Sequence, residues 1–104
     1  CPTNALDLAN AIIQIIKYKD RVDKESKIYN FSNLGYASWF EFAKFILKEI
    51  NFNCNLERIK TNEISQLSKR PKFTITDKTK IISVFNLEIP HWKESLMKFL
   101  KKIK

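Results

Sequence analysis

Glycine is almost absent from this chain of 104 residues, because Gly35 is the only one. A loop that presses its backbone amides against a pyrophosphate needs several glycines in a short motif at a helix start. A single glycine excludes such a loop, and with it the dinucleotide-binding fingerprint. We expect Gly35 to lie in a turn, where glycine tolerates a positive φ angle.

Histidine and cysteine, the usual ligands of transition metals, are also scarce. The chain has one histidine, His91, and two cysteines, Cys1 and Cys54. Their number and spacing fit neither a zinc site nor a disulfide framework. Two distant thiols favour a reducing, cytoplasmic setting. A lone histidine between Pro90 and Trp92 is more typical of a packing or capping residue than of a catalytic base.

Long apolar runs are missing too. None approaches the roughly 18 residues of a membrane span, so we expect no contact with a membrane interior. The chain is nevertheless 44% hydrophobic and 12% aromatic, which is enough for a folded core. It starts at Cys1 rather than at methionine and enters a helical pattern at once. We therefore expect a piece of a longer protein.

Acidic residues are in the minority, with 11 against 19 lysines and arginines and a net charge of +8. Such a balance attracts nucleic acids, acidic surfaces or phosphorylated ligands. However, the lysines are spread along the chain, only three residues are arginine, and no nucleic-acid recognition motif is present. We favour a solvated lysine-rich surface. A basic nucleic-acid-binding module is the least favoured alternative.

The best-marked element of the sequence is a helix within residues 35–50, GYASWFEFAKFILKEI. Ser38 and Glu41 have the spacing of a capping box, in which each side chain accepts a hydrogen bond from an amide at the helix start. Apolar residues then recur at helical spacing: Trp39, Phe42, Ala43, Ile46, Leu47 and Ile50. We expect this face, with Trp39, to be core rather than a ligand site.

The remaining pattern predicts three more helices and two short strands. The first helix covers 2–18 and is capped by Asn4, and two strands follow over 28–32 and 54–60. The next helix covers 77–85, with Thr76 as its cap and Asn86 at its end. Pro90 opens the last helix, which has Trp92 in its buried face. The apolar stripe of the first helix is too broad for a surface helix. We expect it to lie between layers, and to expose apolar surface and invite self-association if the chain is alone.

Several segments carry motifs that occur together in one known family. They are PTNALDLANAI near the start, KIYNFSN followed by SWFEFAKFI, the run RPKFTITDKTKI with Arg70, Pro71, Thr74, Asp77 and Lys80, and finally Pro90, Trp92 and Leu96. In this order they resemble the C-terminal region of dTDP-4-dehydrorhamnose reductases, which are extended short-chain dehydrogenase/reductases. The resemblance covers the chain from Pro2 to about Leu100. It departs from the family at Thr76, where leucine is usual.

The resemblance implies a fold and a place in it. The fold would be α/β, mostly helical, with about four helices and two or three short strands. Residues 1–34 would pack on a Rossmann domain that this chain lacks, and 28–32 would be the last parallel strand of its sheet. Residues 35–104 would form the small substrate-side subdomain.

The resemblance also implies a reaction, the NAD(P)H-dependent reduction of the 4-keto group of a dTDP-sugar in dTDP-L-rhamnose synthesis. That chemistry needs a tyrosine with a lysine four residues later. Tyr18, Tyr29 and Tyr36 are followed at this distance by Val22, Asn33 and Phe40. The chain is therefore not catalytic by itself and holds no cofactor, and NAD(P)H would bind elsewhere in the intact protein. The alternative is a non-catalytic regulatory or scaffolding relative of the same fold. A second copy of the chain, in a homodimer, is a candidate partner.

Substrate contacts are predicted at three positions on the resemblance. Arg70 comes first, because a guanidinium forms bidentate bonds to the phosphate oxygens of a nucleotide sugar. Bracing of its loop through a carboxylate is an equally strong interpretation of Arg70. Pro71 would fix the loop, and Lys80 is a weaker candidate. Trp39 and Trp92 offer rings that stack on a base, but their helical register favours burial in the core.

Overall fold

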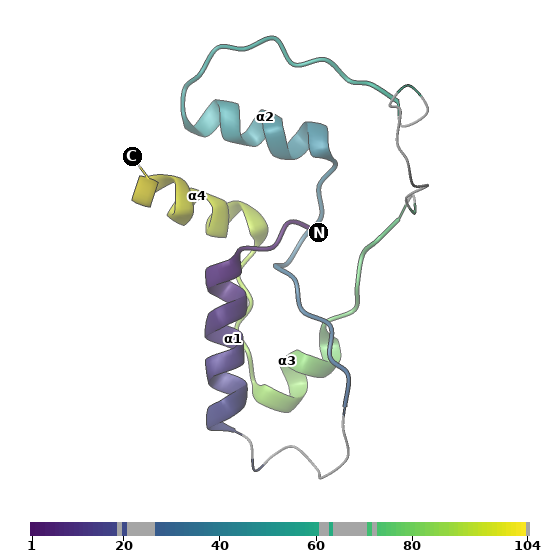
Figure 1. Cartoon of the computed structure of the whole chain (residues 1–104), viewed down its shortest axis with the longest axis vertical. Coiled ribbons are helices and arrows are strands. Elements are labelled where there is room, and N and C mark those ends of the chain that lie inside the picture. The colour runs from purple at the N-terminus through teal and green to yellow at the C-terminus, as the bar shows by residue number, and fades with distance from the viewer. Residues whose placement is uncertain (19, 21–26, 61–62, 64–70, 72, 104) are drawn as a thin grey trace.

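The computed structural model describes residues 1–18, 20, 27–60, 63, 71 and 73–103. Within these ranges lie four α-helices, as predicted: α1 (Ala5–Lys17), α2 (Trp39–Glu49), α3 (Thr79–Phe85) and α4 (Trp92–Ile103). In Figure 1, α1 and α3 occupy one half of the molecule, while α2 and α4 occupy the other. Extended segments connect the two halves.

The predicted strands over 28–32 and 54–60 do not form in the described part of the chain. The sole sheet-like pairing there is a parallel bridge between Leu34 and His91. Its hydrogen bonds run from the Leu34 amide to the Pro90 carbonyl (3.0 Å) and from the Trp92 amide to the Leu34 carbonyl (2.9 Å). A strand needs a neighbour for its backbone groups, and none lies beside these segments. The helical part of the predicted fold is confirmed, and the strands are not.

The first two helices begin where the sequence indicates. The Asn4 side chain accepts from the amide of Leu6 (2.9 Å), which caps α1. At the start of α2, the Ser38 hydroxyl accepts from the Glu41 amide (3.2 Å), and the Glu41 carboxylate accepts from the Ser38 amide (2.8 Å). This capping box is the predicted one.

The third helix starts later than predicted, and Thr76 does not cap it. It begins at Thr79, two residues beyond the expected start. Asp77 instead accepts from the amide (2.9 Å) and the hydroxyl (2.7 Å) of Thr79. These two hydrogen bonds, the amide bond first, lower the pKa of the Asp77 carboxyl. The helix ends as predicted at Asn86, which has a left-handed φ of 51°.

The last helix begins at Trp92, so Pro90 is not its first residue as predicted. The Pro90 carbonyl is engaged by the bridge to Leu34, which holds this proline outside the helix. His91 takes the capping role, because its Nδ1 accepts from the amide of Lys93 (3.3 Å). The interpretation of His91 as a packing or capping residue is thereby supported.

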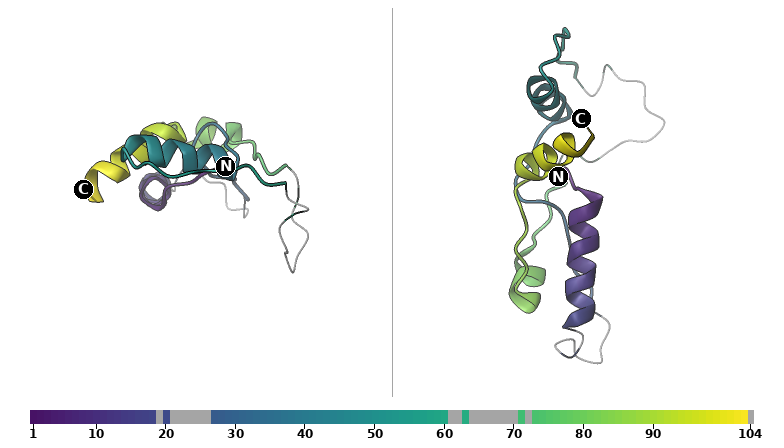
Figure 2. Two further views of the ribbon diagram at one scale, coloured as in Figure 1. Left: turned by 90° about the horizontal axis from the view of Figure 1, so that it is seen from above. Right: turned by 90° about the vertical axis from the view of Figure 1, so that its left-hand side faces the viewer.

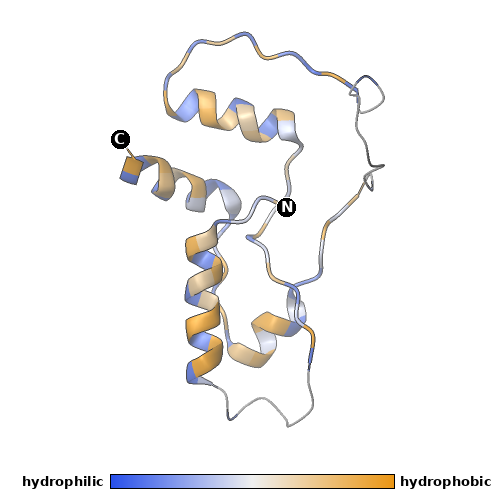
Figure 3. Ribbon diagram, in the orientation of Figure 1, coloured by the Kyte–Doolittle hydropathy of each residue, from blue (hydrophilic) through white to orange (hydrophobic). Residues whose placement is uncertain are grey.

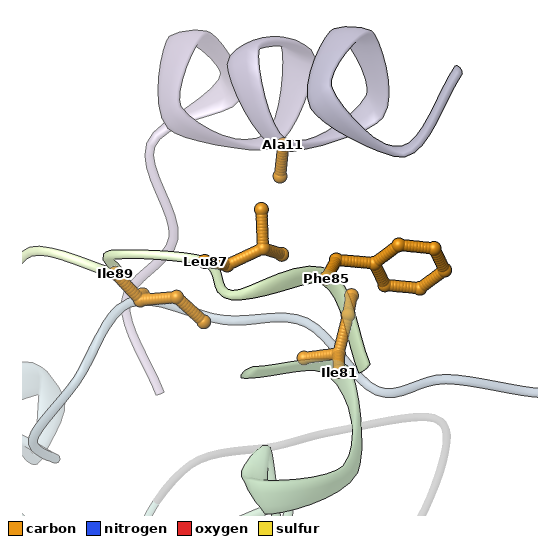
Figure 4. Packing of buried hydrophobic residues seen from close by; sticks show 5 residues of the cluster. All are labelled: Ala11, Ile81, Phe85, Leu87 and Ile89. Atoms are coloured by element: carbon orange, nitrogen blue, oxygen red, sulfur yellow. The ribbon is translucent and has the colours of Figure 1, made fainter. Parts of the chain in front are cut away.

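Apolar packing is divided between the two halves. In the first, α1 and α3 pack around a cluster shown in Figure 4: Ala11, Ile81, Phe85, Leu87 and Ile89. In the second, the Trp92 side chain of α4 is 4% exposed. It contacts two rings of α2, with centroids 5.7 Å from Phe42 and 5.2 Å from Phe45. The predicted burial of Trp92 is confirmed.

A buried polar cluster joins the two halves. Asn33 is 1% exposed. Its side chain donates to the Asp7 carboxylate (2.6 Å) and to the Pro90 carbonyl (3.2 Å), and accepts from the Asn4 amide (2.8 Å). The Ser95 hydroxyl, at the start of α4, donates to the same Asp7 oxygen and accepts from the Asn4 side chain. We refer to Asn4, Asp7, Asn33 and Ser95 as the Asn33 cluster.

The molecule is thin and open. Its extents are 51 × 36 × 19 Å, and Figure 2 shows the narrow dimension. Its accessible surface of 9012 Å² exceeds the roughly 6,100 Å² of a compact 12.3 kDa monomer. Part of the excess is the apolar stripe of α1, coloured orange in Figure 3, where five side chains are 38–63% exposed: Leu6, Leu8, Ile12, Ile13 and Ile16. The expected exposure of this helix is confirmed.

Replacement of Asn33 by alanine should destabilise the chain by about 1–3 kcal/mol, because Asp7 and the Asn4 amide lose a buried partner. Urea unfolding followed by circular dichroism measures this difference. Asn53→Ala, which removes an exposed asparagine, is the matched control and should have little effect. Equal stability of the two variants would contradict the role given to the Asn33 cluster.

The capping box of α2 predicts a pH dependence. Hydrogen bonds from the Ser38 amide and then its hydroxyl lower the pKa of Glu41 below the ordinary 4.5. The folded pKa lies below the unfolded one, so this stabilisation is fully present above pH 4.5 and is lost as the pH falls through the folded value. Wild type should therefore exceed Glu41→Gln in stability at pH 7, and the gap should close in acid. A gap independent of pH, measured by urea unfolding, would refute this.

Candidate functional site

A groove of about 650 Å³ opens on the surface formed by the described residues. The N-terminal segment, the start of α2 and the segment after residue 70 meet around it. Its lining residues are Cys1, Pro2, Thr3, Ala37, Ser38, Trp39, Phe42, Pro71 and Thr74. This size falls within the range of small-molecule sites, about 300–1,000 Å³. We call this hollow the Trp39 groove.

Trp39 was predicted to lie in the core, and this is wrong. Its side chain is 83% exposed. The α2 helix packs through Phe42 and Phe45 on Trp92, the first residue of α4, and its first turn extends past the start of α4 (Figure 1). Trp39 therefore contacts the edge of Phe42, with centroids 6.4 Å apart, and borders the groove with its ring open to solvent.

Two of the three predicted substrate contacts, Pro71 and Lys80, lie in the described residues, and the structure does not bring these two together. Arg70 lies outside the described residues. Pro71 is exposed and lines the Trp39 groove. Lys80 lies elsewhere, where its ammonium donates to the Ile28 carbonyl (3.1 Å) and stands 4.9 Å from the centroid of the Tyr29 ring. Lys80 thus holds the extended segment 28–29 against α3.

A second, smaller cavity of about 280 Å³ lies between the start of α1, α2 and α4. It shares Pro2, Thr3 and Phe42 with the Trp39 groove. Its remaining lining residues are Asn4, Ala5, Asn33, Trp92, Ser95, Leu96 and Phe99. The Asn33 cluster therefore forms one wall of it. Sequence reasoning missed this cavity, although the capping pattern at Asn4 marked one of its residues.

Gly35 does not provide a cradle for a phosphate. It has the expected positive φ, 81°, but a Cβ built on it would lie 2.2 Å from Nε2 of His91. The space that a pyrophosphate would need beside this glycine is occupied by the imidazole ring. The residues of this chain therefore do not fit the glycine-rich part of a dinucleotide site.

The described ranges hold no group of three or more histidine, cysteine, aspartate or glutamate side chains arranged to bind a metal ion. No helix in the described ranges has both the length and the apolar character that are needed to cross a membrane.

Comparison with known proteins identifies the family. The whole chain, residues 1–104, matches the family model described as RmlD substrate binding domain. The chain belongs to this family, and it is a substrate-binding region of dTDP-4-dehydrorhamnose reductase-like proteins. The resemblance found in the sequence is thereby confirmed.

Individual relatives agree with this assignment. The chain is 33% identical to dTDP-4-dehydrorhamnose reductase of Aggregatibacter actinomycetemcomitans, with 91% of the chain and 35% of the relative aligned. It is 29% identical to the enzyme of the same name from Sinorhizobium fredii, with 91% of the chain and 34% of the relative aligned. It is also 29% identical to the spore coat polysaccharide biosynthesis protein SpsK of Bacillus subtilis, with 97% of the chain and 33% of the relative aligned. The chain thus spans about a third of each relative. No solved structure gives a significant match.

Replacement of Trp39 and replacement of Trp92 by alanine should have very different effects on the free energy of unfolding. Trp39→Ala removes an exposed ring and should change the free energy of unfolding by about 0.5 kcal/mol or less. Trp92→Ala empties a buried position and should cost about 3–5 kcal/mol. Urea unfolding of the two variants tests this. A loss of several kcal/mol in Trp39→Ala would contradict the exposed position.

Proposed function

We propose that this chain is the nucleotide-sugar-binding part of an enzyme that reduces the 4-keto group of a dTDP-sugar with NAD(P)H. The family match over all 104 residues carries the proposal. The names of two relatives, both dTDP-4-dehydrorhamnose reductase, supply the substrate and the reaction. The Trp39 groove, open at the start of α2, is the place for the nucleotide sugar.

The cofactor and the catalytic groups would belong to another part of the intact protein. Tyr18, Tyr29 and Tyr36 lack a lysine four residues on, and Gly35 is packed against His91. No chemical step is assigned to the residues of this chain. Their role would be to bind and orient the substrate, which lowers the entropic cost of reaching the reactive geometry.

The N-terminal third of the chain would be the docking side. We propose that residues 1–34 pack on a Rossmann domain and that 35–104 form the substrate-side subdomain. The exposed apolar stripe of α1 supports this, because such a stripe is normally covered. The extended segment 28–32 would then become a strand when it finds a partner in the sheet of that domain.

Without that domain, the same α1 face favours self-association of the isolated chain. We also predict that the protein lies in the cytoplasm and does not bind nucleic acid.

Arg70 remains our first candidate for the diphosphate. The proposal is supported by its sequence neighbour Pro71, which lines the Trp39 groove. A guanidinium there would bind two phosphate oxygens at once. Lys80 is a weaker proposal as a substrate contact, since its ammonium is already bonded to the Ile28 carbonyl.

In the intact protein, Arg70→Ala should raise the KM for the dTDP-sugar about tenfold or more and leave the melting temperature unchanged, because a charge-assisted contact is lost. Steady-state kinetics with the 4-keto sugar nucleotide and NAD(P)H measure this. Arg58→Ala is the control, since its guanidinium lies over the Phe40 ring, 4.5 Å from the centroid.

An unchanged KM in Arg70→Ala would remove the arginine from the site. A wild-type protein that reduces no dTDP-sugar at all would contradict the reductase proposal itself. It would favour the non-catalytic relative instead.

A further inference from the structure

The backbone of Trp39 is held in place, while its indole is exposed. Trp39 is the first residue of α2, and the hydrogen bonds between Ser38 and Glu41 fix the backbone of that first turn. The Phe42 ring contacts the indole in a T-shaped arrangement, with centroids 6.4 Å apart. A ring that is both solvent-open and positioned by its backbone can receive a flat ligand with little loss of conformational freedom.

The surroundings of the ring suit a nucleobase. The Trp39 groove combines the apolar surfaces of Pro2, Phe42 and Pro71 with hydroxyl groups from Thr3 and Thr74. A base offers a π face for stacking and an edge of donors and acceptors for hydroxyl groups. Phosphate groups alone, which have no apolar face, would gain little from an indole face.

On the basis of the proposed function, we infer that Trp39 is the stacking platform for the pyrimidine base of the nucleotide sugar. The base lies on the indole face, and the groove continues from it toward Pro71. The diphosphate and the sugar then extend out of this part of the groove. Trp39 is thus a binding residue and takes no part in bond making or breaking.

A second large exposed aromatic ring, that of Tyr36, lies close to Trp39 in the sequence. Tyr36 is 73% exposed but does not line the groove, and it borders a shallower hollow on the α4 side of α2. Tyr36 is therefore a matched control for the loss of an exposed aromatic residue. The two positions are three residues apart at the same helix start.

The test uses the intact protein with Trp39→Leu, Trp39→Phe and Tyr36→Leu. The dissociation constants of dTDP and of inorganic pyrophosphate are measured by calorimetry, and the KM for the 4-keto sugar nucleotide by kinetics. Trp39→Leu should weaken dTDP binding and raise the KM about tenfold. Trp39→Phe should stay near wild type, because it keeps a ring. Pyrophosphate binding should be unchanged throughout, and Tyr36→Leu should match wild type.

Several outcomes would overturn the inference. One is equal dTDP affinity in Trp39→Leu and wild type, and another is an equal loss in the Leu and Phe variants. A large fall in melting temperature for Trp39→Leu would show that the ring is covered by another domain. The inference and the proposed reaction can fail separately. A protein that binds dTDP through Trp39 but reduces no dTDP-sugar would support the stacking role of Trp39 and contradict the reductase proposal.

Discussion

The relative position of the two halves of the molecule depends on the side-chain amide of Asn33. It donates to Asp7 in α1 and to the Pro90 carbonyl before α4, and it accepts from the Asn4 amide at the start of α1. An unpaired buried amide or carboxylate costs more than one paired bond contributes, so each member holds the others in place. The three chain segments therefore have one relative arrangement.

Apolar packing alone would not fix that arrangement. The α1–α3 cluster around Phe85 and the α2–α4 contact around Trp92 are separate, and hydrophobic contact is not directional. The Asn33 cluster lies between them and sets the position of the N-terminal segment, which forms one side of the Trp39 groove. The groove is thus shaped by hydrogen bonds between distant parts of the chain.

Local features of the fold could be predicted from the sequence, and long-range ones could not. Asn4, the Ser38–Glu41 box and Asn86 act within one helical turn, so spacing alone identified them. The bonds of Asp7 to Asn33 and Ser95 join residues 26 and 88 positions apart, which no local pattern encodes. Trp39 has the same helical register as Phe42. Its exposure depends on where α4 begins relative to α2, and so its role in the candidate site could not be predicted.

The narrow dimension of the molecule, 19 Å, is about the width of two helices with their side chains. A plate of this thickness has only a small interior. Any body that covers α1 would add a third layer and complete an interior on the side now open. The free energy of docking and the free energy of folding are then linked quantities, because whatever binds the folded plate also stabilises it. Mutations on the open face of α1 would shift both at once.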